Sequence, residues 1–209
     1  MTTKSRGCAA LLGVSLSSLL IVGQARADQL VETWAWRAAV ASTISLFYVT
    51  NPIKADRMVF SAGGGEDVSV ARIGAQWDWH HNLLDLFGYQ LGSYVQLDLS
   101  RWQSTLDSTQ AGANNTVGVT PVFRFTRRFE NVTSYVDTGV GAYLFSSDRV
   151  NNTQFGGNFQ FGDMLGTGVF FGGRRQWGVG YKYQHHSNNG IELPNQGINF
   201  HFLTLTYQY

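Results

Sequence analysis

The sequence predicts an all-β protein, an eight-stranded antiparallel transmembrane β-barrel. Three observations predict this fold: apolar and polar residues alternate in segment after segment, charged residues are scarce, and glycine and aromatic residues are abundant. Charged residues make up 14% of the 209-residue chain, whereas roughly 25% is usual for soluble domains. A chain of this length is expected to form one domain.

The composition also excludes several classes of protein. The chain has 15 Lys and Arg against 14 Asp and Glu, a formal net charge of +1, so it lacks the basic surplus of nucleic-acid-binding proteins. Its single cysteine excludes both a disulfide framework and a cysteine-based zinc site. An aromatic content of 14% with so few charges excludes an intrinsically disordered chain.

The first 27 residues have the pattern of a secretory signal peptide. Lys4 and Arg6 precede an apolar stretch at 9–22, and residues 25–27 place alanines where a signal peptidase reads small side chains. Cys8 lies before the apolar stretch, so it does not resemble a lipid-attachment cysteine. We expect residues 1–27 to be cleaved on export; a retained N-terminal anchor is the alternative.

Residues 28–55 form an N-terminal extension whose role the sequence leaves open. Four aromatic side chains in it would suit a membrane–water interface, namely Trp34, Trp36, Phe47 and Tyr48. We expect the barrel itself to occupy residues 56–209.

The alternation is clearest in residues 177–187. Its odd positions begin with Trp177, Val179, Tyr181 and Tyr183, and its even positions carry glycine, lysine, glutamine and histidine. One face of this strand is therefore apolar and aromatic, and the other is small or polar. Eight segments of this kind predict eight strands, at about 56–64, 67–79, 88–102, 115–128, 132–146, 158–171, 176–187 and 198–209.

A soluble β-sandwich would show a charged face to water, but the polar faces of these strands carry few charges and many small residues. Those charges have both signs, as Arg124 and Asp137 illustrate, which favours a narrow, filled barrel interior. A closed barrel also satisfies every backbone polar group in lipid. A secreted soluble β protein is the alternative.

The connections between the predicted strands alternate in length. Residues 128–131 and 172–175 form tight turns, whereas 104–115, 147–158 and 188–197 are longer and polar. Outer-membrane barrels have short periplasmic turns and long external loops. The pattern, together with the signal peptide, predicts an integral protein of the Gram-negative outer membrane.

Two chemically useful side chains lie at the external end of the seventh predicted strand. His185 and Ser187 share the parity of Tyr183, so both face lipid, with Cβ atoms roughly 6–7 Å apart. An imidazole can act as general base for a serine at that separation. The following Asn-Asn-Gly turn offers backbone N–H groups as an oxyanion site. The alternative is two polar residues solvated by lipid headgroups.

Four stretches of the chain resemble the PagL-type lipid A 3-O-deacylases, which are outer-membrane esterases. They are residues 72–79, 121–123, 139–141 and, most specifically, 185–198, and the resemblance extends over about 56–209. It implies an eight-stranded barrel with a lipid-facing Ser-His-acid triad that removes an ester-linked acyl chain from the lipid A of lipopolysaccharide. It implies no metal and no other cofactor.

By position, the resemblance makes Ser187 the nucleophile and His185 the base. The third member of the family's triad, usually Glu, falls on Asn199. An amide oxygen can hold a ring N–H of His185, but it offers no charge to the imidazolium, and an Asp-to-Asn change in a serine triad cost about 10⁴ in turnover. Glu192 is an alternative acid.

The family's oxyanion features fall on the backbone of Asn189 and Gly190 and on the side chain of Asn195. Two outcomes stay open: a hydrolase weakened by its Ser-His-Asn triad, or a non-catalytic small barrel with a degenerate triad. An acyltransferase, which would add mass to lipid A, is a third class.

The other histidines are expected to be structural. His80 and His81 are expected in a turn after the second strand rather than in a metal pair, and His186 is expected to face the interior and pair with a polar group. The expected partners are lipopolysaccharide and outer-membrane lipids, with no nucleic acid. The sequence leaves the oligomeric state open, a homodimer being one option.

Overall fold

The structure is a computed structural model of the whole chain, and it describes residues 38, 42, 45–46, 49–106, 112–151 and 153–209. The chain divides into two compact units, Met1–Ile53 and Lys54–Tyr209. The predicted signal peptide and the four aromatic side chains of the extension lie outside the described residues. None of the described helical residues belongs to a helix long and apolar enough to cross a membrane.

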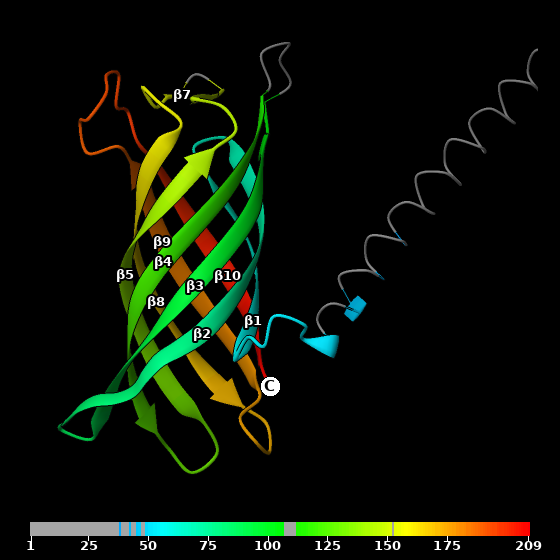
Figure 1. Cartoon of the computed structure of the whole chain (residues 1–209), viewed down its shortest axis with the longest axis vertical. Coiled ribbons are helices and arrows are strands. Elements are labelled where there is room, and N and C mark those ends of the chain that lie inside the picture. Colours follow the sequence, from blue (N-terminus) through cyan, green and yellow to red (C-terminus); the bar gives the residue numbers. More distant parts are fainter. Residues whose placement is uncertain (1–37, 39–41, 43–44, 47–48, 107–111, 152) are drawn as a thin grey trace, which may run out of the picture. The chain divides into compact units, whose positions relative to one another are not determined.

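The second unit is a closed antiparallel barrel of eight strands, which confirms the predicted fold (Figure 1). Around the barrel the strands follow the order β1-β10-β9-β8-β5-β4-β3-β2, so the last strand pairs with the first. The barrel strands are β1 Arg57–Gly65, β2 Val68–Leu86, β3 Tyr89–Ser104, β4 Ala113–Arg128, β5 Thr133–Phe145, β8 Phe159–Phe171, β9 Trp177–Ser187 and β10 Ile198–Gln208. A small hairpin of β6 Arg149–Val150 and β7 Thr153–Gln154 stands in the connection between β5 and β8.

The structure corrects one expectation about β2. The sequence predicted a strand ending near residue 79 and a turn at His80 and His81, but β2 continues to Leu86. Its pairing with β3 shifts register between Asp78 and Leu84, because extra residues on β2 oppose few on β3. This irregularity breaks the alternation of apolar and polar residues, which is why the pattern appeared to stop.

The two ends of the barrel differ. The loop end, at the top of Figure 1, carries the β1–β2 turn and the described parts of the connections between β3 and β4, between β5 and β8 and between β9 and β10. The turn end carries the connections 87–88, 129–132 and 172–176 and the C-terminus. Since β9 runs from the turn end to the loop end, Ser187 lies at the loop end.

Buried polar groups fill the interior and are paired across it. Near the turn end, Arg124 donates to both carboxylate oxygens of Asp137 at 2.7 Å, and the Tyr94 hydroxyl donates to the same carboxylate at 2.8 Å. All three side chains are buried. The pairing offsets part of the cost of placing charges in a narrow interior.

A second hydrogen-bonded chain crosses the middle of the barrel. Arg72 donates to Gln184 at 2.5 Å, Gln184 donates to the Tyr143 hydroxyl at 2.9 Å, and Tyr143 donates to Asp98 at 3.2 Å. The four residues come from β2, β9, β5 and β3. The chain therefore ties strands on different sides of the barrel together.

Glycines on the inward face make room for Tyr143. A Cβ added at Gly118, Gly141 or Gly162 would lie 2.1, 2.8 or 2.5 Å from carbons of the tyrosine ring. These glycines belong to three neighbouring strands, β4, β5 and β8. The glycine-rich polar faces of the sequence are thus a packing requirement of a narrow barrel.

An aromatic plug closes the interior at the loop end. We use this name for the buried cluster of Val68, Val70, Trp102, Tyr143, Phe145, Val150, Phe155, Ile198, Phe200 and Phe202. His186 is fully buried against it, with its ring 4.6 Å from that of Tyr143 and 5.3 Å from that of Trp102. The expectation that His186 pairs with a polar group is wrong, because neither ring nitrogen bonds to any described residue.

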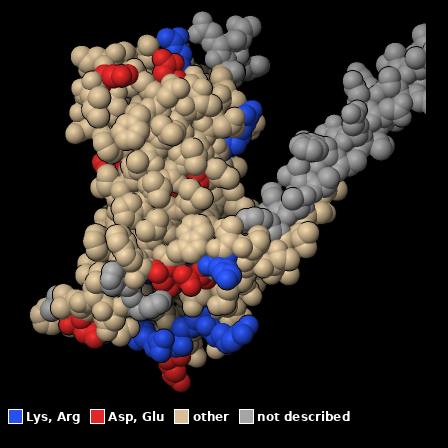
Figure 2. Space-filling view, in the orientation of Figure 1, with Lys and Arg blue, Asp and Glu red and all other residues tan. Residues whose placement is uncertain are grey.

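The outer wall of the barrel is apolar. Each of the eight barrel strands exposes at least one leucine, valine or phenylalanine side chain. On the face shown in Figure 2, charged side chains gather near the two ends and are sparse between them. This distribution is that of a barrel whose middle faces lipid.

The buried Arg124–Asp137 pair provides a test of the interior. Substituting Asp137→Ala leaves the guanidinium buried without its carboxylate, and we expect the free energy of unfolding to fall by about 3–5 kcal/mol. Urea unfolding of the barrel in detergent micelles, followed by tryptophan fluorescence, measures this change. Glu130→Ala, in an exposed turn, is the control and should leave the midpoint unchanged; an equal midpoint for both variants would contradict the assignment.

Candidate active site

His185 and Ser187 lie on the outward face of β9 at the loop end, as the alternation predicted. Both are half-buried, and they continue the row of exposed side chains that includes Val179 and Tyr181. Between them, His186 points inward to the aromatic plug. Because His186 is packed inward, the residues before and after it on the strand face outward.

The antiparallel register sets what flanks the pair. Asn199 on β10 lies opposite His185, and Phe161 on β8 lies opposite Ser187. Directly opposite side chains on one face of a sheet have Cβ atoms about 4.5–5.5 Å apart. The three strands therefore bring a histidine, a serine, an amide and an aromatic ring to one patch of the outer wall.

A hydrogen bond of 2.8 Å joins Nδ1 of His185 to Oδ1 of Asn199. Because an amide oxygen only accepts, Nδ1 carries a proton, and in the neutral ring the lone pair is then on Nε2. The Tyr183 hydroxyl donates to the same Oδ1 at 2.6 Å. The ring lies close to Gly197, where an added Cβ would be 2.8 Å from Cε1 of His185.

This arrangement holds the imidazole in the tautomer that a general base for serine requires. Among the described residues, no hydrogen bond joins His185 to the Ser187 hydroxyl. Nucleophile–base hydrogen bonds are often long without substrate and shorten when substrate binds. The structure thus brings His185 and Asn199 into contact and places Ser187 two residues away on the same face.

The connection after Ser187 begins with a tight turn. Asn189 and Gly190 have φ values of 55° and 78°, and the Ile191 N–H donates to the Asn188 carbonyl at 3.2 Å. Two central residues with positive φ form a type I′ turn, for which Asn-Gly is the preferred sequence. The turn reverses the direction of the chain directly after β9 ends.

The buried Asn188 side chain organises this connection. Its Nδ2 donates to the carbonyls of Phe155 and Glu192, both at 2.8 Å, and its Oδ1 accepts the Gly190 N–H at 2.9 Å. Sequence analysis assigned Asn188 no role of its own. The alternation of β9 continues to an inward position at Asn188, and an asparagine at an inward position could have indicated a structural role for its side chain.

Two of the candidate oxyanion residues, Gly190 and Asn195, therefore already make hydrogen bonds within this connection. The Gly190 N–H is used within the turn, and Oδ1 of Asn195 accepts the Asn188 N–H at 3.0 Å. Since its oxygen is occupied, Asn195 has its amide hydrogens to offer a ligand. The Asn189 N–H is the other candidate donor.

Among the described residues, no hydrogen bond or ion pair joins the alternative acid, Glu192, to the imidazole. One of its carboxylate oxygens is 2.3 Å from the position of a Cβ on Gly157, and Nδ1 of His185 is bonded to Asn199. A different carboxylate meets Asn199: Oε1 of Glu66 accepts its side-chain Nδ2 and its backbone N–H, both at 3.0 Å. Sequence analysis missed Glu66, which is 133 residues from Asn199.

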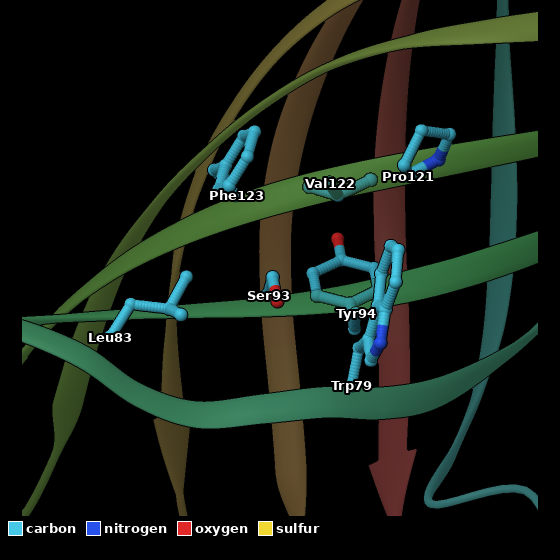
Figure 3. A pocket seen from close by; sticks show the side chains of 7 residues that line it. All are labelled: Trp79, Leu83, Ser93, Tyr94, Pro121, Val122 and Phe123. Carbon is cyan, nitrogen blue, oxygen red and sulfur yellow. The ribbon is translucent and has the colours of Figure 1, made fainter.

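Other features of the described chain offer no rival site. Among the described residues, no group of three or more His, Cys, Asp and Glu side chains converges as a metal site requires. An apolar hollow lies where the irregular part of β2 faces β3 and β4 (Figure 3). Trp79, Leu83 and Phe123 flank it, and Tyr94 and Val122 are buried. Ser93 also lines it, but its lining residues include no histidine or carboxylate that could act as a base.

Comparisons with known proteins match the barrel region. The family model described as lipid A 3-O-deacylase (PagL) matches residues 69–208. The lipid A deacylase PagL of Pseudomonas aeruginosa is 25% identical over 160 residues, which cover 77% of this chain and 90% of that protein. The lipid A deacylase PagL of Bordetella bronchiseptica is 32% identical over 131 residues, which cover 63% of this chain and 70% of that protein.

A solved structure shares the fold. The crystal structure of the outer membrane enzyme PagL superimposes with a TM-score of 0.65 at 22% sequence identity, covering 73% of this chain and 99% of that one. The family model spans most of the barrel, from the start of β2 to the end of β10. The chain therefore belongs to the lipid A 3-O-deacylase (PagL) family.

Proposed function

We propose that this protein is an outer-membrane hydrolase that removes an ester-linked acyl chain, at the 3-position, from the lipid A of lipopolysaccharide. The observation that carries the proposal is the Asn199–His185 hydrogen bond beside Ser187 on the lipid-facing wall. When the imidazole is neutral, this bond leaves Nε2 unprotonated, and Ser187 is two residues away on the same face of β9. Membership of the family supports the same activity.

The reaction follows the logic of a serine esterase. The Ser187 oxygen forms a bond to the ester carbonyl carbon while Nε2 of His185 takes the serine proton. The bond to the sugar oxygen then breaks, and His185 gives its proton to that oxygen, leaving an acyl-enzyme. Water, deprotonated by His185, attacks the acyl carbon, and Ser187 leaves with the proton as the fatty acid is released.

The carbonyl oxygen becomes negatively charged in each step and needs donors. We assign this role to the backbone N–H of Asn189 and the side-chain Nδ2 of Asn195. Gly190, whose own N–H is bonded to Asn188, contributes the positive φ that the turn requires. Such donors stabilise the transition state because they are held in place before charge develops.

The surroundings of Ser187 suit a lipid substrate. Phe161 lies opposite it on β8 and packs edge-on to Phe159, with ring centroids 5.1 Å apart. These rings offer an apolar surface for an acyl chain at the loop end. The interior behind β9 is filled by the aromatic plug, so the substrate approaches from the bilayer. The loop end would then face the cell exterior, where lipopolysaccharide resides.

Replacing the nucleophile tests this function. Ser187→Ala removes the attacking oxygen, and we expect it to abolish the deacylated species when the protein is produced in Gram-negative cells. Mass spectra of extracted lipid A measure the loss of one acyl chain. Ser69→Ala is a matched control, because Ser69 is an exposed strand serine at the same end of the barrel.

Three results would contradict the proposal. Deacylation that persists in Ser187→Ala places the nucleophile elsewhere. An increase in lipid A mass with the wild-type protein identifies an acyltransferase. An unchanged lipid A profile with the wild-type protein favours the non-catalytic barrel.

The oxyanion assignment has its own test. Asn195→Asp keeps an oxygen to accept the Asn188 N–H but loses both amide hydrogens, so we expect kcat to fall by about 100-fold. Initial rates of deacylation by the purified barrel in detergent measure this effect. Asn158→Asp, an equal charge change in another loop at the same end, should leave the rate unchanged. Equal rates for Asn195→Asp and the wild type would remove Asn195 from the site.

A further inference from the structure

Glu66 lies in the two-residue turn between β1 and β2. Glu66 and Asp67 have φ values of 52° and 61°, as a tight hairpin turn at Gly65 and Val68 requires. The pairing of β1 with β10 brings this turn beside the first residues of β10. An added Cβ on Gly65 would lie 2.0 Å from the Asn199 carbonyl oxygen, so only glycine permits this approach.

The Glu66 carboxylate determines which way the Asn199 amide points. Its Oε1 accepts hydrogen bonds from the Asn199 backbone N–H and from Nδ2, both at 3.0 Å. A carboxylate only accepts, so it repels the amide oxygen and holds the amide nitrogen. Oδ1 of Asn199 is thereby turned toward Nδ1 of His185, 2.8 Å away.

The bonds form one continuous line from carboxylate to imidazole. Glu66 holds the amide of Asn199, the amide oxygen holds the proton on Nδ1 of His185, and Nε2 is left as the base. Hydrogen bonds in such chains polarise one another. A negative charge at one end therefore stabilises a positive imidazolium at the other.

We propose that Glu66 is a positioning residue that supplies, through Asn199, the negative charge that Asn199 itself lacks. This inference rests on the proposed function, and it turns the Ser-His-Asn arrangement into a four-residue relay of Ser187, His185, Asn199 and Glu66. The position of the family's acid holds an amide, and the acid stands one hydrogen bond farther away, on the turn of another hairpin. On this proposal, an amide at position 199 means that the negative charge is carried by Glu66, and not that the site has lost its function.

Other carboxylates near the site do not share this connection. Asp163 lies opposite His185 on the outward face of β8, but among the described contacts no hydrogen bond or ion pair joins it to the imidazole. Glu192 lies over Gly157. His201 on β10 and Tyr183 on β9 are the other titratable groups on this side of His185, and their rings lie against each other. The Tyr183 hydroxyl donates to Asn199.

The test begins with Glu66→Gln, which keeps an oxygen to accept from Asn199 but removes the charge. Coulomb's law, with an effective dielectric constant between those of protein and water, gives a change of about tenfold in rate when a charge one amide group away from the ring is removed. We expect kcat for lipid A deacylation to fall about tenfold with KM unchanged. The pH at which activity is half-maximal on the acid side should also move down, by up to about one unit.

Asp67→Asn is the matched control. It removes a charge from the same turn, asparagine tolerates positive φ, and Asp67 uses its backbone carbonyl for its bonds to Thr105 and Asn151. We expect this variant to keep the wild-type rate and the wild-type pH profile.

Moving the charge separates a relay from a structural role for the turn. Asn199→Asp alone places two carboxylates against each other. Glu66→Gln combined with Asn199→Asp lets the new amide donate to the new carboxylate, so the side-chain bond is kept with its direction reversed and the charge is adjacent to the imidazole. We therefore expect Glu66→Gln to lower the rate beside the native Asn199 and to raise it in the Asn199→Asp background. A purely structural role predicts a loss in both backgrounds.

The outcomes distinguish this inference from the proposed function. A wild-type protein without Ser187-dependent deacylation overturns the proposed function and the relay with it. If that deacylation is present but Glu66→Gln matches the wild type in rate and pH profile, the relay alone is overturned. A loss in both backgrounds, with an unchanged pH profile, also overturns the relay.

Discussion

The closed ring of hydrogen-bonded strands is the constraint on which the rest of the structure depends. Closure leaves each strand residue with two options, the filled interior or the outer wall, and the two alternate without exception along a regular strand. The interior is consumed by the Arg124–Asp137 pair, by the hydrogen-bonded chain through Tyr143 and by the aromatic plug. At the loop end, where the aromatic plug closes the interior, the described residues leave no lumen open to a substrate, so chemistry there takes place on the outer wall.

The same alternation gives the candidate site its rigidity. His186 is held by the aromatic plug, and the residues before and after it must then face outward. Asn199 is placed in the same way, because Ile198 and Phe200 on either side of it are fully buried. Two outward side chains from adjacent strands meet because their inward neighbours are anchored, so a short motif at the ends of two paired strands has a defined geometry.

Sequence reasoning predicted the parts of the molecule that depend on local pattern. The ends of the strands other than β2 and the outward parity of His185 and Ser187 follow from period-two alternation, whereas Asn199 was expected beside His185 from the family resemblance. The reasoning was wrong where the pattern is locally broken, as in the irregular part of β2, and where packing overrides polarity, as at His186. It missed Glu66 because that contact depends on the register between the first and last strands, which no local pattern encodes.

The seam between β1 and β10 has a consequence for when the protein becomes competent. Glu66 belongs to the first hairpin and Asn199 to the last strand, so they meet only across the seam that closes the ring. A chain still in transit, with its ends apart, would lack the complete relay. On the proposed relay, the gain in rate of about tenfold that Glu66 contributes would be reached only after the barrel has closed.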